Sequence, residues 1–80
     1  MIALINPKHM DPLDWCDRTG SQLAPYIFPL KIENPEQWRE WGEYVLRSPV
    51  IAAKKPPHPD QFERWEDWAA RFNSAIANLN

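Results

Sequence analysis

Residues 59–79 read PDQFERWEDWAARFNSAIANL, and large apolar side chains recur along them every three or four positions. These side chains are Phe62, Trp65, Trp68, Phe72, Ile76 and Leu79. Their spacing is the period of a helix and excludes the alternation of a strand. Every residue between them is polar, charged or alanine, and alanine has the highest helix propensity. The pattern predicts an amphipathic helix over about residues 60–79, one side of which is aromatic and needs cover.

A second helix is predicted over about residues 35–47. Asn34 is a good N-cap, and Pro35 suits the first helical position because no backbone donor is needed there. The apolar side is marked by Trp38, Trp41, Val45 and Leu46, with Tyr44 beside it. Gly42 costs about 1 kcal/mol of helix stability relative to alanine, so we expect a ring or another helix to pack against it. Pro49 ends the helix.

The two predicted helices begin with the same pattern. Each starts with proline, an acidic residue, glutamine and an aromatic residue, and two further aromatic residues follow at steps of three. Residues at such steps form a ridge inclined to the helix axis. Two alternatives stay open: the two ridges bury each other, or they form an exposed aromatic patch that contacts a partner. Residues 49–59 contain four prolines and predict an extended linker that returns the chain for an antiparallel helix pair.

The amino-terminal residues 1–33 are predicted to form a largely extended arm with one short helical turn over about residues 12–17. Asp11 can cap this turn, and Pro12 suits its first position. Gly20 is expected to end it, because glycine adopts the backbone conformation that closes a helix.

Two prolines shape the segment that follows this turn. Pro25 and Pro29 exclude a helix interior and a central strand over residues 22–33. We expect an extended, partly polyproline-like segment that lays Tyr26 and Phe28 onto another surface. The apolar residues 1–5 leave two alternatives: a terminal segment that packs on the helices, or an arm that adds to another protein.

Length and composition bound the fold. Eighty residues make one domain at most, and we predict a mainly α fold in a single small domain, residues 1–80. This domain consists of the arm, residues 1–33, and a helical pair, residues 34–80. A domain of this size buries only about 60% of its unfolded surface. We therefore expect the two tryptophan-bearing helices to need more cover than the chain offers, so that a neighbouring chain supplies it.

The charge and residue usage exclude several classes of partner. The net charge of −2 argues against non-specific nucleic-acid binding, which needs a basic stripe. The sequence has no run of eighteen apolar residues, so we predict no contact with a membrane. Cys16 is the single cysteine, which leaves no internal disulfide and suggests a reducing, cytoplasmic environment.

The sequence shows no convincing catalytic or metal-binding pattern. Cys16 with His9 or His58 lacks the local signature of a nucleophile and its base, and also lacks the ligand spacing of a zinc site. Three aspartates at steps of three lack the glycine and the final glutamate of a calcium loop. They are Asp11, Asp14 and Asp17. We therefore predict no enzyme activity, no cofactor and no metal.

Residues 56–73 read PPHPDQFERWEDWAARFN, in which two prolines precede Phe-x-x-Trp-x-x-Trp-Ala on an amphipathic helix. This pattern resembles small proteins of tailed bacteriophages that are minor components of the virion or of the tail module. The resemblance covers about a quarter of the chain, and no catalytic or ligand residue carries over. It implies a non-enzymatic structural or adaptor protein that is made in the host cytoplasm and located in the virion. There it would dock onto tail, fibre or portal proteins.

The predicted partners are other proteins of a larger assembly, including further copies of this chain. Rigid aromatic side chains are efficient anchors because little side-chain entropy is lost when they bind. The predicted partner-binding residues are Trp38, Trp41, Tyr44, Trp65, Trp68, Tyr26 and Phe28. The alternative function is a phage-encoded inhibitor that binds and blocks a host defence or regulatory protein. Such an inhibitor would be compact, monomeric and acidic on one face.

Overall fold

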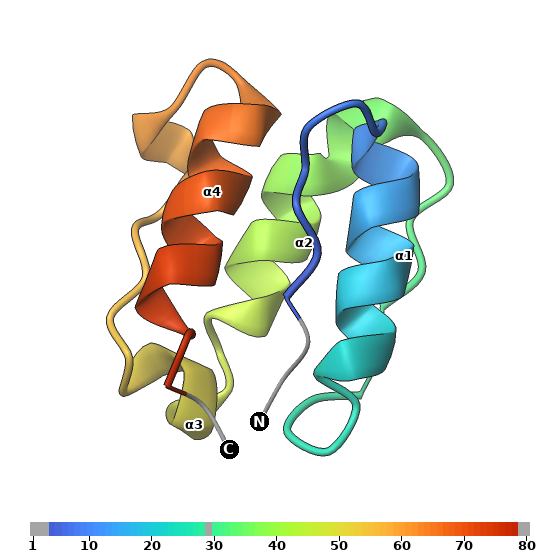
Figure 1. Ribbon diagram of the computed structural model, residues 1–80. Helices are drawn as coiled ribbons and strands as arrows, with labels where there is room; N and C mark the ends of the chain where they lie inside the picture. Colours follow the sequence, from blue (N-terminus) through green and yellow to red (C-terminus); the bar gives the residue numbers. More distant parts are fainter. Residues whose placement is uncertain (1–3, 29, 79–80) are drawn as a thin grey trace.

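A computed structural model describes residues 4–28 and 30–78, and these residues form helices and turns without any β-strand (Figure 1). The α-helices are α1 (Pro12–Gln22), α2 (Trp38–Val45), α3 (Pro49–Ala52) and α4 (Trp65–Ala75). α2 lies between α1 and α4, and the principal extents are 27 × 22 × 22 Å. The prediction of a mainly α fold is confirmed. Within the described ranges, no helix combines the length and the apolar character that crossing a membrane requires.

The first helix begins as predicted but is longer. The Asp11 carboxylate accepts a hydrogen bond from the backbone N–H of Asp14 over 2.8 Å, and Pro12 occupies the first position. The predicted turn at residues 12–17 and the predicted stop at Gly20 are wrong, because α1 continues to Gln22. Gly20 is buried in the helix, and a β-carbon there would lie 3.8 Å from Trp41 Nε1. Packing against Trp41 therefore holds the helix together beyond a residue that usually ends one.

The repeated Pro-acid-Gln pattern forms two 3-10 turns, η1 (Pro35–Gln37) and η2 (Pro59–Gln61). The first turn continues directly into α2, whereas α4 starts only at Trp65. Between η2 and α4 the backbone of Phe62 is extended, with φ −127° and ψ 141°, and its carbonyl oxygen accepts a hydrogen bond from Arg39 Nη2 over 2.5 Å. In a continuous helix that oxygen would accept the N–H four residues later. Both helices are thus shorter than the predicted ranges 35–47 and 60–79, and Leu79 lies outside the described residues.

The predicted linker contains a helix of its own. α3 occupies part of residues 49–59, and its Ile51 is fully buried. Beyond α3 the chain is irregular up to η2, and the carbonyl oxygen of Pro57 accepts a hydrogen bond from Trp68 Nε1 over 2.8 Å. The linker therefore contacts α4 at Pro57 and takes part in the core through Ile51.

Trp15 of α1 lies at the centre of the core. Its ring centroid is 5.4 Å from that of Trp41 and 5.8 Å from that of Trp68, both in edge-to-face geometry. Phe72 lies 6.1 Å from Trp15, and these four side chains have no exposed area. Edge-to-face aromatic pairs contribute about 0.5–1.5 kcal/mol each beyond the burial of their area. Helix α1, which is longer than the sequence predicts, supplies the cover that the tryptophans of α2 and α4 need.

The amino-terminal segment is tied to two helices. The carbonyl oxygen of Ile5 accepts hydrogen bonds from Trp15 Nε1 over 2.8 Å and from Asn73 Nδ2 over 2.9 Å. Residues 1–5 were predicted either to pack on the helices or to form an arm that adds to another protein. Ile5 packs on the helices, and residues 1–3 lie outside the described part of the chain.

Candidate partner-binding surface

The structure separates the seven predicted partner-binding residues into two groups. Trp41 and Trp68 are fully buried, Trp38 is 6% exposed, and Trp65 is half-buried. These tryptophans lie in or against the core and present little surface to a partner. Tyr26 and Tyr44 are half-buried at the surface, and Phe28 is 87% exposed.

Tyr26, Phe28 and Tyr44 come together although they belong to different segments. Tyr44 lies on α2, and the other two follow α1, where residues 23–27 form turns. The Tyr44 hydroxyl donates a hydrogen bond to the carbonyl oxygen of Phe28. Ser48 Oγ donates a hydrogen bond to the carbonyl oxygen of Tyr26 over 3.2 Å. The carboxyl-terminal end of α2 thereby holds the segment that carries the exposed ring.

A shallow hollow of about 200 Å³ lies on this surface. We call the six residues that line it the aromatic surface: Tyr26, Ile27, Phe28, Tyr44, Arg47 and Ser48. Arg47 is exposed and is the one residue of the six that carries a charge. Burying a phenylalanine side chain contributes about 1.5–3 kcal/mol, so Phe28 alone has the apolar area of an anchor. The surface combines one exposed apolar ring, three hydroxyl groups and one cation.

The single cysteine has no access to a substrate. Cys16 is 1% exposed in the core, and burial raises the pKa of its thiol far above the ordinary value. A buried thiol of this kind stays protonated and is inert, because the thiolate is the nucleophile.

Asp11 and Asp14, two of the three aspartates near the start of α1, have structural roles. A hollow of about 320 Å³ is lined by Asp11, Asp14, Asp17 and Lys31, among others. Asp11 caps the helix, and one carboxylate oxygen of Asp14 pairs with Arg18 Nε over 3.2 Å. Lys31 lines the same hollow, so a basic residue adjoins these aspartates.

Sequence reasoning missed the cover that α1 gives to the tryptophans. A signal was present, because Trp15, Thr19 and Leu23 follow one another at steps of four. All three are buried, as the apolar side of a full helix would be. Gly20 and the nearby prolines obscured that pattern.

The chain has been compared with protein families, with curated proteins and with solved structures. Its aromatic surface is built from a turn and the end of a helix, an arrangement that many unrelated folds can provide. None of the three comparisons gives a match, so the interpretation of this surface rests on the chain's own residues.

Proposed function

We propose that the chain is a non-enzymatic adaptor that docks onto another protein through the aromatic surface. The observation that carries the proposal is Phe28, whose side chain is 87% exposed. Its backbone is held by Tyr44, and the neighbouring Tyr26 is held by Ser48. An anchor that is already ordered loses less conformational entropy on binding than a mobile one. On this proposal the residues that contact the partner are Phe28, Tyr26 and Tyr44, and the tryptophans do not contact it.

The partner that suits this surface is a protein with an apolar pocket for one aromatic ring and an acidic group at its rim. The ring is Phe28, and the acidic group would face Arg47. A stable interface needs about 800 Å² from each partner, so residues around the hollow must contribute as well. Leu30 follows Phe28 closely in the chain, and Val50 follows Ser48. Both are exposed, so we propose that they also contact the partner.

We place this adaptor in a bacteriophage particle, where it would dock onto tail, fibre or portal proteins. The support is the resemblance of residues 56–73 to small phage virion proteins, together with an exposed aromatic anchor on a small rigid body. On this proposal the chain is located in the virion, and its partners are virion proteins or further copies of itself.

The second candidate is a phage-encoded inhibitor of a host defence or regulatory protein. The observation that favours it is the core, in which Trp15, Trp41 and Trp68 are fully buried by the chain's own residues. A chain that covers its own tryptophans needs no neighbour to complete its core, and this suits a protein that acts as a free monomer. The same aromatic surface would then contact the blocked protein.

One experiment separates these alternatives. The phage that encodes the chain is grown with the wild-type sequence, with Phe28→Ala or with Leu4→Ala, and purified particles are analysed by native and quantitative mass spectrometry. Leu4 is the matched control, because it is an exposed apolar residue outside the aromatic surface. If the chain is an adaptor, the wild type and Leu4→Ala should be present at a fixed copy number per particle. The Phe28→Ala chain should be absent from the particles.

The other outcomes are equally informative. A chain that is absent from particles and monomeric in the infected cell supports the inhibitor. Particles that hold Phe28→Ala at the wild-type copy number contradict docking through the aromatic surface. Circular dichroism of the purified variants checks that neither substitution unfolds the chain.

A further inference from the structure

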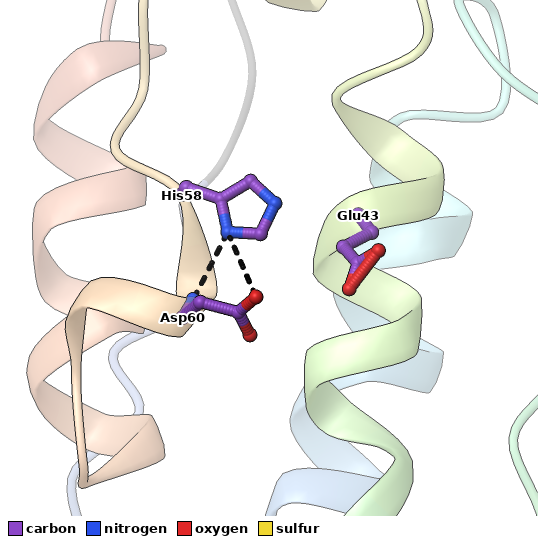
Figure 2. A group of neighbouring side chains, drawn as sticks. All are labelled: Glu43, His58 and Asp60. Atoms are coloured by element: carbon purple, nitrogen blue, oxygen red, sulfur yellow. Dashed lines mark hydrogen bonds and ion pairs between the residues drawn. The ribbon is translucent and has the colours of Figure 1, made fainter.

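Three side chains with metal-ligand chemistry meet between α2 and η2. They are Glu43 of α2, His58 before η2 and Asp60 within it (Figure 2). One ligand atom from each lies within 4.8 Å of the other two. Figure 2 shows the His58 imidazole and the Asp60 carboxylate directed from the turn toward α2, the helix that carries Glu43. The group does not overlap with the aromatic surface.

The backbone positions of this group are fixed by the core. Pro59 stands between His58 and Asp60 and is buried. A β-carbon at Gly42, the residue before Glu43, would lie 2.9 Å from Pro59 Cγ. Helix and turn are therefore held in close contact by packing, and the ligands need not bring them together. Sites whose ligands lie on rigid, preorganised elements bind with the least reorganisation.

The donor set favours a borderline divalent cation. One imidazole nitrogen and two carboxylate oxygens form a set of three protein ligands of the kind that binds Zn²⁺ and leaves a fourth position open. Ca²⁺ and Mg²⁺ prefer oxygen ligands alone, so the imidazole disfavours them. Tetrahedral ligands of Zn²⁺ stand about 3.4 Å apart, which follows from metal–ligand distances of about 2.1 Å. The exposed Glu43 side chain can rotate to close the remaining gap.

The ligands already make contacts that a cation would have to displace or share. His58 Nδ1 accepts a hydrogen bond from the Asp60 backbone N–H over 3.1 Å and lies 3.7 Å from Asp60 Oδ2. Asp60 Oδ1 lies 3.9 Å from Arg39 Nε, so one oxygen of this carboxylate faces a cation and the other faces the imidazole. A metal ion would replace the weak backbone hydrogen bond at Nδ1 and bridge His58, Asp60 and Glu43.

We propose that Glu43, His58 and Asp60 form a binding site for a divalent transition-metal ion of the Zn²⁺ class, which fastens the segment around η2 to α2. The ion binds the folded chain, because Glu43 is brought to the other two ligands only by folding. Binding therefore stabilises the fold by linkage. The open coordination position is free for water or for a ligand supplied by another protein.

The test uses the untagged full chain at neutral pH, with ZnCl₂ as the probe. Isothermal titration should give one ion per chain, and the melting temperature should rise with ZnCl₂. At a free Zn²⁺ concentration of one hundred times Kd, the folding equilibrium constant rises about one-hundred-fold. MgCl₂ at the same concentration should give no such rise.

Matched variants decide whether these three residues bind the ion. His58→Gln and Glu43→Gln should lower the Zn²⁺ affinity at least about ten-fold and abolish the rise in melting temperature. His9→Gln, at the one other histidine, and Glu40→Gln, at another exposed glutamate of α2, should keep both. The proposal is overturned if the wild type binds no Zn²⁺ up to millimolar concentration, or if His58→Gln binds it as tightly as the wild type. All four side chains are at least partly exposed, and circular dichroism checks that the variants fold.

Discussion

Gly42 of α2 lies so close to Pro59 that a β-carbon at position 42 would stand 2.9 Å from Pro59 Cγ and 3.0 Å from Trp68 Cζ2. The glycine therefore makes room for both a proline and an indole ring, as its position inside a predicted helix suggested. Both neighbours are buried and have little freedom to move. This contact joins α2 to the linker and to α4.

Gly42→Ala should destabilise the chain, although alanine is the better helix former. Overpacking of a core costs about 1–3 kcal/mol, which exceeds the helix preference of alanine. Gly20→Ala is the matched control, because a β-carbon there would meet Trp41 atoms at 3.8–3.9 Å, an ordinary contact distance. That variant should be more stable than the wild type by about 0.5–1 kcal/mol. Urea unfolding followed by circular dichroism measures the free energy of unfolding of both variants. If both substitutions stabilise the chain, or both destabilise it, the packing described for Gly42 and Gly20 is contradicted.

Trp68→Phe should cost far more stability than Trp65→Phe. Trp68 is fully buried, and its loss leaves the carbonyl oxygen of Pro57 without its hydrogen bond, which costs about 1–3 kcal/mol in addition to the lost ring volume. Trp65 is half-buried, so we expect a loss of about 1 kcal/mol or less. Chemical unfolding of both variants gives the comparison. Similar losses would show that the two rings share the core equally.

Raising the pH above about 8.5 should destabilise the fold through Cys16. Burial raises the pKa of its thiol, whereas the unfolded thiol ionises near pH 8.5. Above that pH the folded chain keeps a proton that the unfolded chain releases, so the free energy of unfolding falls by up to about 1.4 kcal/mol per pH unit. The contribution of the buried thiol to the free energy of unfolding is fully present below pH 8.5. Cys16→Ala should flatten the profile between about pH 8 and 9.5, and an unchanged slope would assign the effect to other groups.

Tyr44→Phe should loosen the segment that carries Phe28 without unfolding the core. The substitution removes the hydroxyl that donates to the Phe28 carbonyl oxygen and keeps the ring. We expect the free energy of local opening of this segment to fall by about 0.5–1.5 kcal/mol. Hydrogen exchange at Tyr26 and Ile27 should become faster, while exchange in α4 stays unchanged. Uniform acceleration across the chain would mean that the hydroxyl supports the whole fold.

The fold was partly predictable because hydrophobic period and capping are local properties. The helical character of α2 and α4, the cap at Asp11 and the close packing at Gly42 all follow from neighbouring residues. The helix limits depend on contacts between distant residues. Phe62 is extended and its carbonyl oxygen accepts a hydrogen bond from the distant Arg39, and α4 starts only at Trp65.

The candidate sites were less predictable, because they depend on which side chains remain uncovered. The periodicity of the tryptophans identifies the side of each helix that packs. This side is buried because α1 packs against it. The exposure of Phe28 follows from the turns that end α1. His58 and Asp60 are visible as a short motif in the sequence, but the approach of Glu43 requires the contact between Gly42 and Pro59.

The Ile5 carbonyl oxygen, which accepts from Trp15 and from Asn73, has a consequence for how the protein is made. Ile5 and Asn73 are 68 positions apart, so a ribosome synthesises the acceptor long before the second donor. Until the residues of α4 emerge, Trp68 and Phe72 cannot pack against the ring of Trp15, and its apolar surface stays exposed to solvent. Contacts that join distant residues form late in folding. The core around Trp15 can therefore form only after the residues of α4 have left the ribosome.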